Sequence, residues 1–159
     1  MARSSKIKRR TVDPDPKFGS LLVTRLVNRA MDSGKKSASQ TQVYKALDIV
    51  EEKTKVKGLE ALETAIRNIT PQMEVRSRRV GGAAYQVPVP VKTYRGASLA
   101  VRWLIKEAAK RSNKEYHTYA EKLAAEIIDA LDETGGAIQR KVTAHKMADA
   151  NKAFAHFRW

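Results

Sequence analysis

Apolar residues recur with helical spacing in several stretches of the chain, and residues that stop helices separate these stretches. A repeat of three or four positions places one side of a helix in a core. The first stretch runs from Leu21 to Asp32, and Gly34 suits the left-handed turn that ends it. Ser37 to Gln40 has the spacing of a capping box for a second helix, and a third helix follows Gly58 and stops at Thr70-Pro71. Their predicted core positions are Leu22, Val23, Leu26, Val27, Ala30, Met31, Val43, Ala46, Leu47, Val50, Leu59, Leu62, Ala65, Ile66 and Ile69.

Three more helices are predicted in the second half of the chain. The clearest covers about residues 94–111. A second capping box, Ser112 to Glu115, is expected to open the fifth helix, and Gly135-Gly136 precedes the sixth. The apolar stripe of the fifth helix is complete enough to mark it as core. The predicted core positions are Ala97, Ala100, Val101, Leu104, Ile105, Ala108, Tyr116, Tyr119, Ala120, Leu123, Ala124, Ile127, Ile128, Leu131, Ile138, Val142 and Met147.

The segment between the third and fourth helices, about residues 73–91, predicts a β-hairpin. Two runs rich in β-branched residues flank Gly81-Gly82, a pair that tolerates the positive φ of a tight turn. Pro88 and Pro90 lack amide protons and fall on one side of their strand, so no further strand can pair with that edge. The hairpin is therefore expected to protrude from the helices instead of joining a larger sheet.

Arginines dominate the first strand of this hairpin. Arg76 and Arg78 point to one face and Arg79 to the other, because strand side chains alternate. Neither face is expected to join a core. Since a bare two-stranded ribbon is only marginally stable in water, the pattern favours an arm that is held by a polyanion.

These elements predict a mainly α fold: a single six-helix domain with a protruding two-stranded hairpin between helices three and four, and a basic N-terminal arm. The expected divisions are an arm at 1–17, where Asp13-Pro14-Asp15-Pro16 blocks helix formation, a helical domain at 18–149 and an aromatic-basic tail at 150–159. Two roles are open for the tail, which either stacks on bases or packs back on the domain.

The net charge of the chain limits the kinds of molecule that are expected to bind it. The chain has 159 residues, with 31 Lys and Arg against 17 Asp and Glu, and a net charge of +14. Such an excess favours nucleic acid or an anionic membrane surface. The chain has no cysteine, which excludes disulfides and thiolate metal sites and fits a reducing compartment. No apolar run approaches the roughly 20 residues that span a bilayer, and the basic start of the chain lacks the apolar stretch of a secretory signal.

No convincing catalytic, cofactor or metal site is found in the sequence. Metalloprotease, phosphate-loop and dinucleotide glycine motifs are absent. His145 and Asp149 are four apart on a predicted helix and share a face, but this spacing favours an exposed polar pair over a metal or acid–base site. The chain is therefore expected not to be an enzyme and to need no cofactor.

Five motifs resemble bacterial small-subunit ribosomal protein seven, in the family's order and spacing along essentially the whole chain. They are Asp15-Pro-Lys-Phe-Gly19, Gly34-Lys-Lys36, Val75-Arg-Ser-Arg-Arg-Val-Gly-Gly82, Tyr85-Gln-Val-Pro88 and Ala150-Asn-Lys-Ala-Phe-Ala-His156. The resemblance implies a structural protein of the cytoplasmic ribosome. Such a protein binds the 3′ major domain of 16S ribosomal RNA and nucleates assembly of the subunit head.

The resemblance also implies partners beyond the ribosomal RNA. The hairpin and the C-terminal part would lie near the exit-site transfer RNA and the messenger path, with proteins nine and eleven of the small subunit among the neighbours. The residues expected to lie near transfer RNA and messenger RNA are Gly81, Gly82, Ala83, Ala84, Tyr85, His156, Arg158 and Trp159.

Basic clusters supply the expected contacts with ribosomal RNA, because folded RNA is recognised largely through its backbone and unpaired bases. Five basic residues lie in the N-terminal arm, and others follow the hairpin into one face of the fourth helix. The full set is Arg3, Lys6, Lys8, Arg9, Arg10, Lys35, Lys36, Arg76, Arg78, Arg79, Lys92, Arg95, Arg102, Lys110, Arg111 and Lys114.

Two other classes of protein share some of these features. An architectural nucleic-acid-binding protein, or a regulator that binds messenger RNA, would have the same charge and helix content, but a helix-turn-helix reader needs a recognition helix with base-reading side chains. An RNA-modifying enzyme needs a cofactor loop or a nucleophile. Co-sedimentation with small ribosomal subunits at moderate salt separates these classes.

Overall fold

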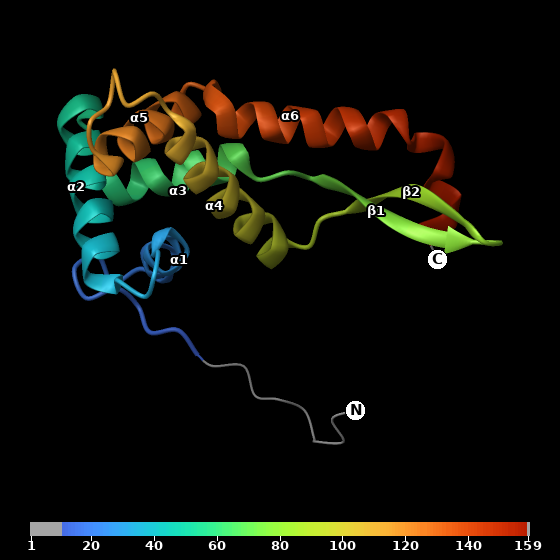
Figure 1. Cartoon of the computed structure of the whole chain (residues 1–159), viewed down its shortest axis with the longest axis horizontal. Helices are drawn as coiled ribbons and strands as arrows, with labels where there is room; N and C mark the ends of the chain where they lie inside the picture. Colours follow the sequence, from blue (N-terminus) through green and yellow to red (C-terminus); the bar gives the residue numbers. More distant parts are fainter. Residues whose placement is uncertain (1–10, 159) are drawn as a thin grey trace.

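The computed structural model describes residues 11–158 and arranges them as a helical domain with one long projecting arm (Figure 1). In chain order the elements are α1 (Leu21–Ala30), α2 (Lys36–Thr54), α3 (Gly58–Ile69), β1 (Met73–Val80), β2 (Ala83–Pro90), α4 (Thr93–Lys110), α5 (Tyr119–Leu131), α6 (Gly135–Ala150) and the 3-10 helix η1 (Lys152–Arg158). This order confirms the predicted mainly α fold with a hairpin between α3 and α4. Among the described residues, no helix has both the length and the hydropathy needed to cross a bilayer.

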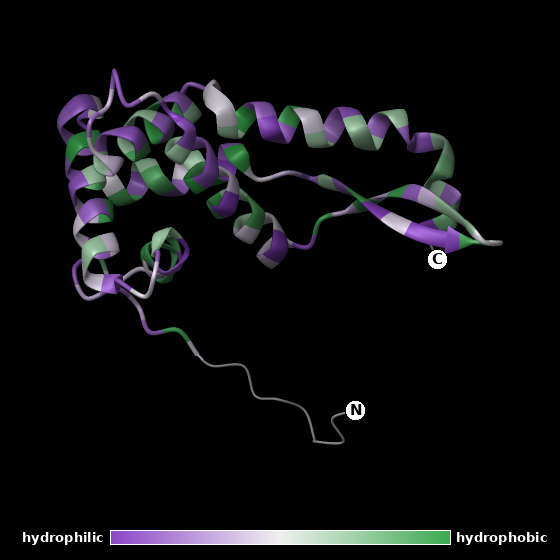
Figure 2. Ribbon diagram, in the orientation of Figure 1, coloured by the Kyte–Doolittle hydropathy of each residue, from purple (hydrophilic) through white to green (hydrophobic). Residues whose placement is uncertain are grey.

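The core forms around α5, which packs against α2, α3, α4 and α6. Leu123 and Ile127 of α5 are fully buried, together with Leu62 of α3 and Leu104 of α4. The apolar stripe predicted for α5 is thus confirmed as core. Figure 2 shows hydrophobic residues gathered where these helices meet, while the hairpin strands carry hydrophilic stretches. Burial of these side chains is the main source of stability in a domain of this kind.

A close approach between α2 and α3 explains the glycine at the start of α3. A Cβ atom at Gly58 would lie 2.7 Å from the backbone oxygen of Leu47. A larger residue would therefore force the two helices apart, so the short connection between them depends on glycine here.

Neither of the two predicted capping boxes begins a helix. Helix α2 starts at Lys36, with Lys35 as its N-cap, and Ser37 lies inside the helix. Helix α5 starts at Tyr119, where Thr118 and Glu121 form the capping box. The predicted start at Ser112 is wrong because the spacing of a capping box recurs a few residues later, and the later one places Tyr119 against the core.

Two further details differ from the sequence prediction. Helix α1 ends at Ala30, not at Asp32, because Met31 already has an extended backbone. On α6, Val142 and Met147 are 37% and 51% exposed, so they are not core residues. The reason is visible in Figure 1, where α6 runs out beyond the helical domain alongside the hairpin and leaves no core for its C-terminal half to join.

Replacing Leu123 by alanine is expected to lower the free energy of unfolding by about 2–5 kcal/mol, because the change empties a fully buried position. Urea unfolding at neutral pH measures the difference. The matched control is Val142→Ala, which removes an exposed apolar side chain from α6 and is expected to change stability by less than about 0.5 kcal/mol. Equal losses in the two variants would contradict the assignment of α5 as the centre of the core.

Candidate nucleic-acid interface

The hairpin is an isolated antiparallel pair whose register puts its arginines at the surface. Val80 pairs with Ala83 across the turn, and Gly81 and Gly82 have φ values of 59° and 91°. This confirms the predicted two-residue turn. Arg76, Arg78 and Arg79 are all exposed. Their strand alternation places the first two on one face and the third on the other.

The middle of β2 is buried, which corrects the expectation that neither face joins a core. Val87 is fully buried and Pro88 is also buried. The two prolines do leave the sheet with only two strands within the described residues. The hairpin is therefore rooted in the domain at one end and exposed at the other.

An ion-pair cluster ties β1 to α4 at the base of the hairpin. The carboxylate of Glu74 accepts hydrogen bonds from Nε of Arg95 at 2.7 Å and from Nε of Arg76 at 2.7 Å. Burial of the carboxyl raises the pKa of Glu74, but the bonds from Arg95 and Arg76 outweigh this effect and hold the pKa below its ordinary value. Arg95, predicted to contact RNA, thus also anchors the arm.

The C-terminal segment packs against the hairpin near its turn. The ring centroid of Tyr85 lies 5.3 Å from that of Phe154 and 5.2 Å from that of Phe157. Of the two roles left open for the tail, packing back is the one observed, with the hairpin as the surface it covers. His156 and Arg158 remain exposed on this segment. The predicted transfer-RNA-proximal residues of the turn and the tail are therefore brought together, and Trp159 lies outside the described residues.

The basic face of α4 is divided between exposed and engaged side chains. Lys92 precedes the helix and is exposed, whereas Lys110 donates to Glu107 at 3.1 Å. Arg102 is half-buried, and its Nε has no hydrogen-bond partner within the described part of the chain. The predicted stripe is thus present, and Lys92 is exposed at its N-terminal end.

Arg111 has a structural contact that the sequence did not indicate. Its guanidinium group bonds the buried carboxylate of Glu126 at 2.6 Å and also contacts Asp129. Burial alone would lower the pKa of Arg111, but the bonds to these two carboxylates raise it. Because these carboxylates occupy the side chain, we omit Arg111 from the surface proposed to bind RNA. Lys114, in the loop that follows, is exposed.

The remaining predicted contacts come from the first 36 residues of the sequence. Lys35 and Lys36 are exposed at the start of α2. The residues of the basic arm, Arg3, Lys6, Lys8, Arg9 and Arg10, lie outside the described residues. From Asp15 onward the chain is tied to α2, because the buried Asp15 carboxylate accepts from the Tyr44 hydroxyl at 2.7 Å and Phe18 packs edge-on against the Tyr44 ring.

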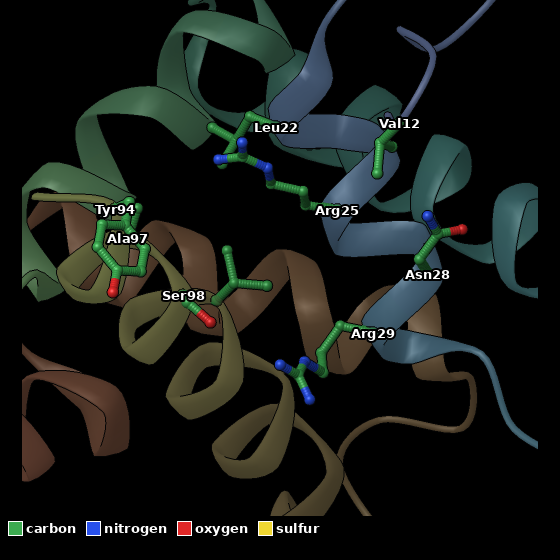
Figure 3. Close-up of a pocket in the computed structure, with 9 residues that line it drawn as sticks. Val12, Leu22, Arg25, Asn28, Arg29, Tyr94, Ala97 and Ser98 are labelled. Atoms are coloured by element: carbon green, nitrogen blue, oxygen red, sulfur yellow. The ribbon is translucent and has the colours of Figure 1, made fainter. Parts of the chain in front are cut away.

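Sequence reasoning missed two exposed arginines on α1. Arg25 and Arg29 face α4 across a groove that Tyr94 and Ser98 also line (Figure 3). The signal that would have found them is a pair of arginines four residues apart on the opposite face of that helix.

The residues considered for catalysis have ordinary structural contacts. Nε2 of His145 accepts from the backbone amide of Gln72 at 3.0 Å, so this ring helps to hold the segment before β1. Across residues 11–158 there is no cluster of three or more histidine, cysteine or acidic side chains that could hold a metal ion.

A rigid helical domain that bears a braced, arginine-rich arm defines a structural nucleic-acid-binding protein. Comparison with known proteins identifies the family. The profile of the ribosomal protein S7p/S5e family matches residues 2–152. The small ribosomal subunit protein uS7 of Thermomicrobium roseum is 52% identical over 159 residues, and that of Heliobacterium modesticaldum is 50% identical, with both chains covered completely in each case. The uS7 protein of Azorhizobium caulinodans is also 50% identical over the full length of both chains.

The chain therefore belongs to the ribosomal protein S7p/S5e family. It is a structural component of the small ribosomal subunit and not an enzyme, and it works in the cytoplasmic ribosome with ribosomal RNA and other ribosomal proteins. Family membership thus confirms the resemblance found in the sequence, and it confirms that translation is the process in which this protein takes part.

Replacing Glu74 by glutamine is expected to destabilise the protein most at neutral pH. The folded-state pKa of Glu74 lies below its ordinary value of 4.5, so the ionised group stabilises the fold above that pH. This stability is lost as the pH falls through the lowered folded-state pKa. The difference in unfolding free energy between the intact protein and Glu74→Gln should therefore shrink on acidification. Urea unfolding from pH 7 to pH 3 measures it.

The control for this series is Glu52→Gln, which removes an exposed carboxyl without an ion pair in the described structure. The difference in unfolding free energy between this variant and the intact protein should stay small and nearly independent of pH. If Glu74→Gln behaved in the same way, the ion-pair cluster would not hold the hairpin to α4.

Proposed function

We propose that this chain is a primary binder of the 3′ major domain of 16S ribosomal RNA and nucleates assembly of the small-subunit head. The observation that carries the proposal is the projecting hairpin, whose three arginines are exposed on an arm that the rest of the fold braces. Proteins nine and eleven of the small subunit are the proposed neighbours, on the basis of the family resemblance alone.

Phosphate neutralisation is the proposed mechanism of binding. Arginine bridges phosphate oxygens through two parallel hydrogen bonds, which a lysine cannot do. At the base of the hairpin, Arg76 and Arg95 share the single carboxylate of Glu74, so this cluster keeps a net positive charge. Together with Lys92 just before α4, and with Lys35 and Lys36 at the start of α2, these groups supply the phosphate contacts.

The hairpin arm is already ordered in the free protein, and this favours its binding to RNA. A ribbon that ordered only on RNA would lose conformational entropy when it bound. Here the ring of Tyr85 packs against Phe154 and Phe157, and Glu74 links β1 to α4. The hairpin therefore presents its arginines in a defined geometry. The basic residues Arg3, Lys6, Lys8, Arg9 and Arg10 are proposed as a second contact with the RNA.

The turn of the hairpin is proposed to serve translation more than assembly. Residues 81–84 are exposed and carry no charge, so they offer no strong phosphate contact. Their small side chains permit the close approach of a second RNA, which we propose to be the exit-site transfer RNA near the messenger path. The exposed His156 and Arg158 lie on the segment that packs beside this turn.

Replacing Arg76 and Arg78 together by alanine is expected to weaken binding to 3′-domain RNA and to lower the melting temperature only slightly, because Arg95 still pairs with Glu74. Each phosphate contact contributes roughly 0.7–0.9 to the slope of log affinity against log salt, so the slope should fall by about 1.4–1.8. Filter binding of the full chain between 50 and 400 mM salt measures it.

The control removes the same charge elsewhere, through Lys53→Ala with Arg67→Ala, two exposed residues on α2 and α3. The slope of log affinity against log salt should stay closer to that of the intact protein in this control than in the hairpin variant. An unchanged slope in the hairpin variant would contradict the phosphate contacts. Equal affinity of the intact chain for 3′-domain RNA and for an unrelated structured RNA would favour a general architectural binder instead.

Shortening the hairpin by removing Val80 and Ala83 tests the role of the turn. These residues pair with each other, so their removal keeps the two glycines and the register of Arg79 with Ala84. Subunits reconstituted with this variant are expected to assemble normally and to retain exit-site transfer RNA less well. The control Gly81→Asn keeps the length of the hairpin. It also keeps the conformation of the turn, because asparagine tolerates positive φ. Poor assembly would make the turn an assembly element, and normal transfer RNA retention would contradict its proposed role.

A further inference from the structure

A groove between α1 and α4 is lined by positive and neutral side chains only. It has a volume of about 440 Å³, and Figure 3 shows Arg25 and Arg29 extending from α1 toward the side of α4 that carries Tyr94 and Ser98. Pockets that hold small ligands usually measure about 300–1,000 Å³, so the space suits one ligand of nucleotide size.

The two arginines at this groove differ from those that bond carboxylates elsewhere in the described structure. Arg25 and Arg29 are exposed, and within residues 11–158 neither forms an ion pair. By contrast, Arg95, Arg111 and Arg140 each bond a carboxylate. Because no acidic residue lines the groove, its positive charge is not neutralised locally and is available to an anion.

The rest of the lining suits a flat aromatic group. Tyr94 is 66% exposed although it is a large aromatic residue, and Ala97 and Val101 provide apolar surface beside it. Ser98 adds a hydroxyl group that can donate and accept hydrogen bonds. An exposed ring next to two arginines is the combination that binds unpaired bases, through stacking on the ring and contacts with the phosphates.

We propose that this groove binds a single unpaired nucleotide of a folded RNA. The base stacks on Tyr94 over the apolar surface of α4, and Arg25 and Arg29 bind the phosphates on either side of it. A paired base cannot enter, because both of its faces are covered by its neighbours in the helix. The inference deepens the proposed function and rests on it for the identity of the RNA, while the site itself is separate from the hairpin.

Two substitutions of Tyr94 test the stacking. Tyr94→Leu keeps an apolar side chain but removes the ring, and it is expected to weaken binding of the full chain to 3′-domain RNA by about tenfold. Tyr94→Phe keeps the ring and should stay within about twofold of the intact protein. Since the side chain is largely exposed, both variants are expected to fold normally, which circular dichroism verifies. Equal affinity of the two variants would overturn the stacking.

The arginines are tested through the salt dependence of the same binding. Arg25→Ala with Arg29→Ala should lower the log–log slope by about 1.4–1.8, as expected for two lost phosphate contacts. The control is again Lys53→Ala with Arg67→Ala. Millimolar adenosine monophosphate should not displace the RNA. Displacement would show that the groove takes a free nucleotide, and this would overturn the proposal.

Photo-crosslinking separates failure of this inference from failure of the proposed function. Total small-subunit ribosomal RNA containing bromouridine is bound to the intact chain, and the crosslinked peptides and nucleotides are identified. Crosslinks from the groove peptides to an unpaired nucleotide support the inference, even if that nucleotide lies outside the 3′ domain, in which case only the proposed function fails. Binding to the 3′ domain with crosslinks at the hairpin alone overturns the inference and leaves the function standing. If no RNA is bound, both fail.

Discussion

The buried carboxylate of Glu126 is the interaction on which the arrangement of this molecule depends. Its side chain is 2% exposed, accepts from Nη2 of Arg111 at 2.6 Å and accepts from the backbone amide of Ala137 at 2.8 Å. It therefore joins the end of α4 to the start of α6 through α5. A buried carboxylate without these partners would be strongly destabilising, so the three helices have to meet here. The meeting point sets the direction in which α6 leaves the domain.

That direction has a consequence for the hairpin. Because α6 runs alongside the hairpin, η1 reaches β2, and the rings of Phe154 and Phe157 meet Tyr85 (Figure 1). A two-stranded ribbon alone would be marginally stable. Here it is supported near the turn by the C-terminal segment and at the base by the bonds between Glu74 and Arg95. The helical domain thus acts as a rigid base for an arm that extends well beyond it.

The arginines divide into those that bond carboxylates and those that do not, and the amino-acid composition cannot distinguish the two groups. Arg111 bonds a buried carboxylate and holds helices together, whereas Arg25, Arg29 and Arg79 are exposed. All carry the same charge, but a guanidinium group already bonded to a buried carboxylate is a poor partner for a phosphate, since releasing it would leave that carboxylate unpaired. The net charge of +14 therefore does not indicate which cations are offered to RNA or where they lie.

The amino-acid sequence by itself determined the helices, the hairpin and its turn, because apolar periodicity and the Gly81-Gly82 pair depend on local spacing alone. It also indicated the family through motifs along the whole chain. Only the tertiary structure decided which of several possible caps begins α5, since the choice rests on how Tyr119 packs against the core. The same holds for the partners of Arg111 and for the groove beside Arg25. Carboxylates 15 and 18 residues away bond Arg111. The groove beside Arg25 has its other wall in α4, about 70 residues further along the chain. Local periodicity carries no information about contacts over such distances.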